Sequence, residues 1–156
     1  MTISVEEWSG KDRKDENFPV GSVLIAAKLR PHVHAFYAFA RNADDIADSS
    51  TLDSADKIAR LAVMEAVLLG HRQAGSPSAT RLRESLAACG VTPRHAQDLL
   101  VAFRRDATRP RTPDLADLLD YCRHSAAPVG RHVLALHGES EACWPASDAL
   151  CAALQI

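Results

Sequence analysis

Apolar residues recur along this chain at intervals of three and four positions, and no stretch shows the sustained alternation that is typical of a strand. One apolar stripe runs from residue 55 to residue 69 and is followed by Gly70, a residue type that often ends a helix. A second stripe runs from 78 to 89 and is followed by Gly90. The pattern therefore predicts an all-α fold.

Prolines mark the starts of the later helices. Pro93 and Pro113 each follow a threonine, and a capping residue followed by proline is a usual helix start. The helix that starts at Pro113 is expected to be long and to be kinked at Pro128, because proline removes one backbone hydrogen bond. It should then resume as far as Gly138, and a last helix should start at Trp144.

The first part of the chain divides into an arm and the beginning of a domain. Residues 1–16 are charged and aperiodic, which predicts a flexible N-terminal arm, and residues 17–156 are expected to form part of one domain. A short helix is predicted over 23–28 and a longer one from Pro31 to about Asp48. The longer helix is nearly apolar in its first half, so it should be buried and its polar side chains need partners.

Composition narrows the class of protein. Hydrophobic residues make up 47% of the 156 residues, and the net charge of −2 argues against a nucleic-acid-binding surface. The N-terminus carries no basic start followed by an apolar segment, so no signal peptide is predicted. The four cysteines form no C-x-x-C pair, and we interpret them as reduced core thiols of a cytoplasmic protein.

One face of the helix that starts at Pro31 carries the candidate chemistry. Tyr37, Arg41, Asp44 and Asp48 recur at i, i+4, i+7 and i+11, so they share that face. Its two carboxylates would lie about 6 Å apart along the helix axis. Carboxylate oxygens suit Mg²⁺, which readily shares its ligand shell with substrate phosphates.

Acidic residues at the end of a helix are unfavourable, which is the argument for a metal. Asp44, Asp45 and Asp48 oppose the helix macrodipole and repel one another, and a cation would relieve both penalties. The alternative is a solvated acidic helix end. Arg41 either forms an ion pair with Asp44 or Asp45 or grips a phosphate. Tyr37 either packs as a core ring or contacts a ligand.

Two other features also have two interpretations. Small residues, a proline and a glycine lie between Tyr121 and Arg131, where a bend would either let two helices pack closely or make room for an apolar ligand. A basic patch is either a solvated face or a surface that attracts an anionic substrate or a membrane. It consists of Arg104, Arg105, Arg109 and Arg111.

The chain resembles the squalene/phytoene synthase family in two motifs. They are Tyr37-x-x-x-Arg41-x-x-Asp44-Asp45-x-x-Asp48 and Tyr121-Cys122-x-x-Ser125-Ala126-x-Pro128-Val129-Gly130. The second motif and the segment Glu16-Asn17-Phe18-Pro19-Val20-Gly21-Ser22 are similar to the hopanoid-pathway branch of that family, the HpnC-like hydroxysqualene synthases. The resemblance covers the chain from about Asp15.

The resemblance implies the N-terminal portion of an isoprenoid-synthase-type helical bundle, in which two Asp-rich motifs bind Mg²⁺ and a diphosphate across a central cavity. Asp44 and Asp48 would then be Mg²⁺ ligands, with Asp45 a second-rank candidate. Tyr37 and Arg41 would orient the diphosphate and assist its departure. The further substrate-binding candidates are Phe18, Tyr121, Val129 and Gly130.

The implied reaction is the conversion of presqualene diphosphate to hydroxysqualene with release of diphosphate. Squalene or phytoene synthesis, and a non-catalytic helical binding module, are the alternatives. Residues 148–156 resemble the helix that precedes the second Asp-rich motif of the family, so this chain is expected to be truncated and inactive by itself. We also expect association with the inner membrane surface, and self-association through an exposed apolar face.

Overall fold

The computed structural model describes residues 3–6, 23–108 and 114–156. These residues form α-helices and one short 3-10 helix, with no strand among them, so the predicted all-α fold is confirmed. The helices are α1 (Arg30–Ala47), α2 (Ser54–Leu68), α3 (Pro77–Cys89), α4 (Arg94–Thr108), α5 (Leu115–Ser125), α6 (Ala127–Leu136), η2 (Glu141–Cys143) and α7 (Trp144–Gln155).

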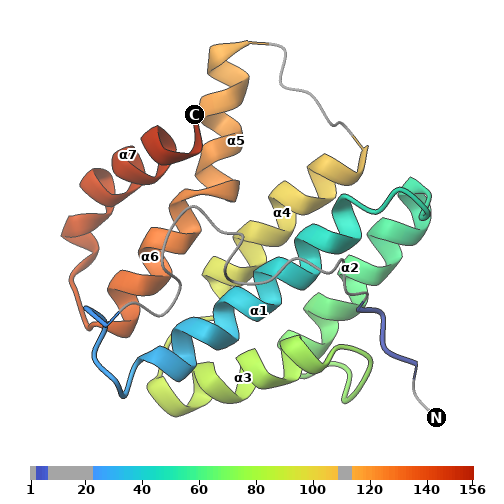
Figure 1. Ribbon diagram of the computed structural model, residues 1–156, viewed down its shortest axis with the longest axis horizontal. Coiled ribbons are helices and arrows are strands. Elements are labelled where there is room, and N and C mark those ends of the chain that lie inside the picture. The colour runs from blue at the N-terminus through green and yellow to red at the C-terminus, as the bar shows by residue number, and fades with distance from the viewer. Residues whose placement is uncertain (1–2, 7–22, 109–113) are drawn as a thin grey trace.

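Helix α1 packs against α2, α3 and α4 (Figure 1). Its side chains Phe39 and Ile46 are fully buried, together with Met64 of α2 and Leu100 of α4. Burying a side chain of this size stabilises the fold by about 1.5 to 3 kcal/mol. The largely apolar first half of α1 is therefore the reason that it lies inside the bundle.

Side-chain caps fix the starts of three helices. Asp53 accepts a hydrogen bond from the backbone N–H of Asp56 at 2.8 Å, and Ser76 caps α3 in the same way. Asp114 does so for α5, where it accepts from the backbone N–H of Asp117. Gly90 ends α3 at φ 66°, a left-handed conformation that favours glycine. The predicted bounds of α2 and α3 are thus correct to within one residue.

The prediction of a short helix over 23–28 is wrong, because these residues form turns. Arg30 holds them, donating from Nε to the carbonyl of Ile25 at 2.8 Å and from Nη2 to the carbonyl of Val23 at 3.1 Å. Val23 is largely exposed, so little burial is available to offset the cost of starting a short helix.

The long kinked helix predicted from Pro113 is two helices, α5 and α6. The break lies at Ala126, which has φ −115° and ψ −51°. Pro128 lies in the first turn of α6, where its missing N–H costs no hydrogen bond. Proline therefore starts a new helix here rather than bending a continuous one.

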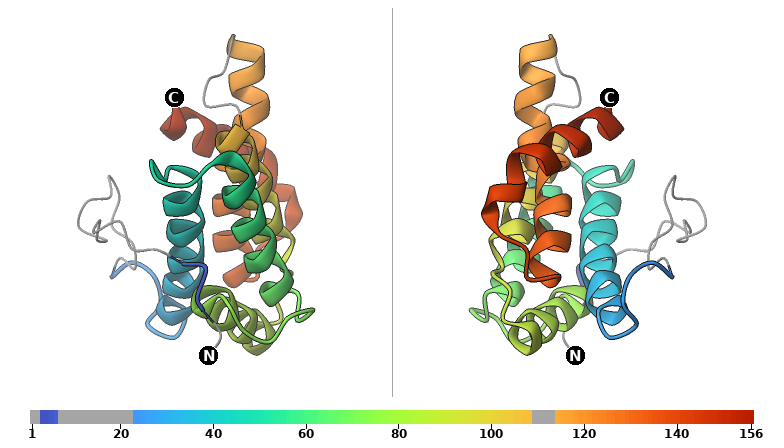
Figure 2. Two further views of the ribbon diagram at one scale, coloured as in Figure 1. Left: turned by 90° about the vertical axis from the view of Figure 1, so that its right-hand side faces the viewer. Right: turned by 90° about the vertical axis from the view of Figure 1, so that its left-hand side faces the viewer.

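Helices α5, α6 and α7 form one side of the molecule. Helix α6 packs against α4, α5 and α7, whereas α5 extends past the other helices at one end of the bundle (Figures 1 and 2). Within the described ranges, no helix combines the length and the apolar character that crossing a membrane requires. Several large apolar side chains of α5 and α7 are exposed, namely Leu115, Leu119, Leu150 and Leu154.

Candidate functional site

A pocket of about 220 Å³ lies where α1, α4 and α6 meet. Most of its wall is apolar, and its polar members come from one stretch of α1 and from one residue of α6. The lining residues are Val33, Phe36, Tyr37, Ala40, Arg41, Asp44, Phe103, Val129, His132 and Val133. A lining of this kind suits a ligand that has an apolar part and a polar end.

Tyr37, Arg41 and Asp44 line the pocket together, as their spacing along one helix face predicts. Buried residues on the opposite side of α1, such as Phe39, fix the rotation of this helix in the bundle. The polar face must then point towards α4 and α6. The core packing of α1 therefore determines which side chains reach the pocket.

Arg41 forms ion pairs with two of the three neighbouring carboxylates. Its Nη1 lies 2.9 Å from Asp44 Oδ2, and its Nη2 lies 2.8 Å from Asp45 Oδ1. The side chain of Asp45 is 5% exposed, whereas that of Asp44 is 34% exposed. Asp45 thus anchors the guanidinium from the protein side, and Asp44 remains accessible to a ligand.

Asp48 lies one turn beyond Asp44, at the C-terminal cap of α1, and is exposed. Its negative charge acts on Asp106 of α4, a residue that the sequence analysis did not select. Burial raises the pKa of the Asp106 carboxyl, and the charge of Asp48 adds to this rise. The end of α1 and the end of α4 therefore form a region of unfavourable negative charge.

Tyr121 joins the same region from α5. Its hydroxyl donates to Asp106 Oδ2 at 2.7 Å. Burial raises the pKa of Tyr121 well above its usual value, and the hydrogen bond to Asp106 and the charges of Asp106 and Asp44 add to the rise. The phenol therefore stays protonated as a hydrogen-bond donor. It is not among the residues that line the pocket.

The carboxylates at the end of α1 suit a Mg²⁺ ion that is bound jointly by the protein and a phosphate ligand. They do not form a site that would enclose the metal with protein groups alone. No group of three or more His, Cys, Asp or Glu side chains in the described ranges is arranged to hold a metal by itself. Asp44 and Asp48 lie one turn apart and could each supply an oxygen ligand. Mg²⁺ commonly takes one or two carboxylates and completes its shell with water and phosphate.

Six lining residues were not predicted as site residues, namely Val33, Phe36, Ala40, Phe103, His132 and Val133. Phe36 precedes Tyr37, and His132 and Val133 follow Val129 at i+3 and i+4. Helical spacing from Val129 would therefore have found both. Phe103 lies on α4, and the packing of α4 against α1 brings it into the pocket wall.

The remaining predicted site residues lie elsewhere. Phe18 is outside the described residues. Gly130 does not line the pocket but faces α7, where an added Cβ would lie 2.7 Å from Cys151 Sγ and closer still to Ser147 Oγ. This glycine lets α6 and α7 pack closely, the first of the two interpretations of the bend.

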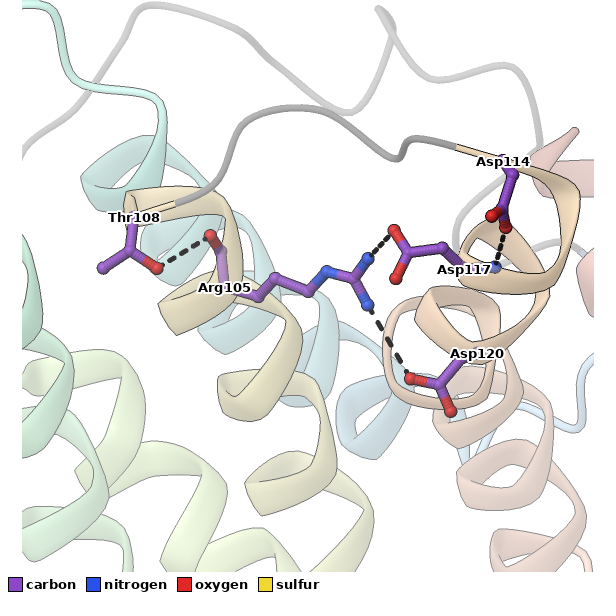
Figure 3. Close-up of polar contacts among 5 residues, drawn as sticks. All are labelled: Arg105, Thr108, Asp114, Asp117 and Asp120. Atoms are coloured by element: carbon purple, nitrogen blue, oxygen red, sulfur yellow. Dashed lines mark hydrogen bonds and ion pairs between the residues drawn. The ribbon is translucent and has the colours of Figure 1, made fainter.

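The arginines of the predicted basic patch are paired where the structure describes them. Arg105 of α4 forms an ion pair with Asp117 of α5. Its Nη1 also lies 3.7 Å from Oδ2 of Asp120, one turn further along α5 (Figure 3). Arg104 forms an ion pair with Glu65. These two arginines therefore hold α4 against α5 and α2, and Arg109 and Arg111 lie outside the described residues.

Comparison with known proteins gives the family. The sequence model described as "Squalene/phytoene synthase" matches residues 11–156. This chain belongs to the squalene/phytoene synthase family. The resemblance inferred from the two motifs is thereby confirmed.

Individual members of the squalene/phytoene synthase family show which branch this chain is similar to. The hydroxysqualene synthase of Rhodopseudomonas palustris is 52% identical over 156 residues, which are 100% of this chain and 53% of that protein. The hydroxysqualene synthase of Sinorhizobium fredii is 50% identical over the same shares of each chain. The 15-cis-phytoene synthase of Pantoea ananas is 31% identical over 74% of this chain and 40% of its own length. The chain spans about half the length of these relatives.

A solved structure of the squalene/phytoene synthase family has the same fold. The crystal structure of squalene synthase HpnC from Alicyclobacillus acidocaldarius matches with a TM-score of 0.75 and 35% identity. The match covers 92% of this chain and 55% of that chain. The helices of this chain are therefore arranged as in that squalene synthase. The prediction of an isoprenoid-synthase-type helical bundle is confirmed.

Proposed function

We propose that this chain provides the N-terminal part of a Mg²⁺-dependent enzyme that converts presqualene diphosphate into hydroxysqualene and diphosphate. One observation carries the proposal: an apolar pocket whose polar end is built from Tyr37, Arg41 and Asp44. The identity of 49 to 52% to three hydroxysqualene synthases over nearly the whole chain supports the same branch.

The diphosphate would bind at the polar end of the pocket. Arg41 presents a planar fork of N–H donors that matches phosphate oxygens, and Asp45 holds the guanidinium in place. Tyr37 would donate its phenol hydrogen to the same group. Asp44 and Asp48 would hold Mg²⁺, which when bound neutralises charge on the departing diphosphate.

The prenyl chain would bind along the apolar wall. Loss of diphosphate leaves a carbocation, which any nearby water can capture. Phe36, Phe103 and Val129 exclude water from most of this wall. One water molecule must still enter for the product to be an alcohol.

Head-to-head prenyl transfer is the second candidate function. The neighbouring crystal structure bears the name squalene synthase, and phytoene synthases are also relatives. The diphosphate end described above would serve that reaction equally well. We favour hydroxysqualene because the hydroxysqualene synthases are 49% identical or more, against 31% for the phytoene synthase of P. ananas.

Product analysis tests this choice. The 156 residues would be extended by the C-terminal remainder of the R. palustris relative and incubated with presqualene diphosphate and Mg²⁺. We expect hydroxysqualene as the main product by mass spectrometry. A parallel incubation supplies an allylic prenyl diphosphate instead. Squalene or phytoene formed there, with no alcohol formed from presqualene diphosphate, would contradict the assignment. The 156-residue chain alone is the control and should release no diphosphate.

We also propose that the enzyme works in the cytoplasm and reaches its lipid substrate at the inner membrane surface. The support is the apolar character of the pocket and of its proposed product. Arg104 and Arg105 are paired with acidic residues, so we do not assign membrane contact to them. Co-sedimentation of the protein with anionic or neutral lipid vesicles tests the proposal. We expect the protein in the pellet of anionic vesicles. Its absence from both pellets would contradict the proposal.

A further inference from the structure

His132 is a buried polar residue whose ring nitrogens lack a partner. Its residue exposure is 1%, and neither Nδ1 nor Nε2 has a hydrogen-bond partner among the described residues. Leaving a buried polar group unsatisfied costs about 1 to 3 kcal/mol. A ligand or a water molecule that supplied the missing partner would remove that cost.

The position of His132 indicates where such a partner would lie. The residue lines the pocket, and one face of its ring stacks on Phe36 with the ring centroids 3.9 Å apart and an interplanar angle of 11°. Phe36 therefore covers one ring face, and the two buried nitrogens lie on the ring edge. The pocket volume of about 220 Å³ easily holds a water molecule beside it.

The ring is also kept in its neutral form. Burial, with smaller contributions from the charges of His95 and His32, lowers the pKa of His132 to about 3. A neutral imidazole has one N–H donor and one lone-pair acceptor. It can therefore both donate to and accept from a hydroxyl group, which an imidazolium cannot.

We propose that His132 is a hydroxyl-binding residue of the pocket, whose imidazole holds a water molecule or the hydroxyl of an isoprenoid alcohol within an otherwise apolar wall. Its nitrogens lack a protein partner because that partner is the bound oxygen. His132 would thus decide whether the product is an alcohol or a hydrocarbon.

The chemical step rests on the proposed function. After diphosphate has left, an oxygen lone pair of the held water forms the new C–O bond to the carbocation. The resulting oxonium gives one proton to the His132 nitrogen that accepted its hydrogen bond. The imidazolium, whose pKa is low, returns this proton to solvent as the product leaves. If the water is absent, the cation instead loses a proton from carbon and a hydrocarbon forms.

A binding experiment on the 156-residue chain tests the hydroxyl site without turnover. The probes are farnesol and the matched hydrocarbon farnesene, and the readout is the ring ¹⁵N resonance of His132 in histidine-labelled protein. Farnesol should shift this resonance and farnesene should not. In His132→Phe the affinity for farnesol should fall about tenfold, the size of one lost hydrogen bond, with farnesene unaffected. His132→Gln, which keeps a donor and an acceptor, should restore part of the affinity.

His95→Phe is the matched control. His95 is equally buried and packs edge-on against His132 and Trp144, but it does not line the pocket. Its replacement should leave farnesol affinity unchanged. Equal affinities for farnesol and farnesene would overturn the hydroxyl site. So would an equal loss of farnesol affinity in His132→Phe and His95→Phe.

The product ratio then tests the step itself in the extended chain. His132→Phe should lower the ratio of alcohol to hydrocarbon about tenfold. An unchanged ratio in His132→Phe would overturn the role of His132 and leave the proposed function intact. Failure of the unsubstituted extended chain to make the alcohol would instead reject the proposed function, and the farnesol experiment would still decide the hydroxyl site.

Discussion

Arg41 is the residue on which the polar end of the pocket depends. It forms ion pairs with Asp44 and Asp45, and its own side chain is 17% exposed. Both interpretations of its sequence position can therefore hold. The pair with Asp45 is structural, and the pair with Asp44 occurs at the point where a phosphate would bind.

Replacing Arg41 with alanine should destabilise the protein. Asp45 would keep its burial and lose its counter-charge, which costs about 3 kcal/mol or more for a buried ion pair. Urea unfolding of Arg41→Ala measures this. The double variant Arg41→Ala with Asp45→Asn should recover a good part of the loss. A change below about 0.5 kcal/mol in the single variant, typical of surface sites, would count against a structural pair.

His132 should make the protein less stable in acid. Its folded pKa of about 3 lies below the usual 6.5, so protons bind preferentially to the unfolded chain. Its stabilising effect is complete above pH 6.5 and is lost as the pH falls towards 3, at up to about 1.4 kcal/mol per pH unit. The free energy of unfolding from pH 7 to 5 should fall more steeply in the wild type than in His132→Phe. Parallel profiles would disprove the buried neutral state.

Sequence spacing predicted the site residues only where they share one helix. Tyr37, Arg41 and Asp44 face the pocket as expected, because helical geometry alone fixes their common side. Asp106 and His132 were not predicted, because their importance comes from residues of other helices. Asp106 accepts a hydrogen bond from Tyr121, and the ring of His132 stacks on Phe36. Both contacts form only in the folded bundle.

At the level of elements, caps and glycines predicted helix bounds better than apolar patterns did. Gly90 marks the end of α3 correctly. The apolar stripe from Pro113 onward did not show that the chain breaks at Ala126, because α5 and α6 place their stripes on nearly continuous positions. The break follows from Pro128, which lies in the first turn of α6, and α6 then packs against α4 and α7.

Gly130→Ala should weaken the contact between α6 and α7. An added Cβ would lie 2.7 Å from Cys151 Sγ and still closer to Ser147 Oγ, which forces a shift of α7. Such overpacking typically costs about 1 to 3 kcal/mol. Thermal unfolding measures the loss. Adding Ser147→Ala and Cys151→Ala should restore stability, since both remove the contacting atom; a triple variant as unstable as Gly130→Ala would refute the close approach.

At the scale of the whole molecule, the apolar surface of α5 and α7 is the unusual feature. Leu150 and Leu154 are 62% and 80% exposed, and Leu115 of α5 is also exposed. Exposed apolar patches of this kind promote association. We expect the 156-residue chain to self-associate in sedimentation velocity experiments. Leu150→Glu with Leu154→Glu should shift it towards monomer, and a monomeric wild type at all concentrations would contradict the expectation.

The central claim is that Asp44 and Asp48 bind Mg²⁺ together with the diphosphate of the substrate. The most direct test is diphosphate release from presqualene diphosphate by the extended chain as a function of Mg²⁺ concentration. The wild type should depend on Mg²⁺, and Asp44→Asn with Asp48→Asn should lose most of its turnover, about a hundredfold or more. Glu139→Gln, which removes an exposed carboxylate on another helix connection, should change nothing. Turnover without Mg²⁺, or undiminished turnover in the double variant, would contradict the account.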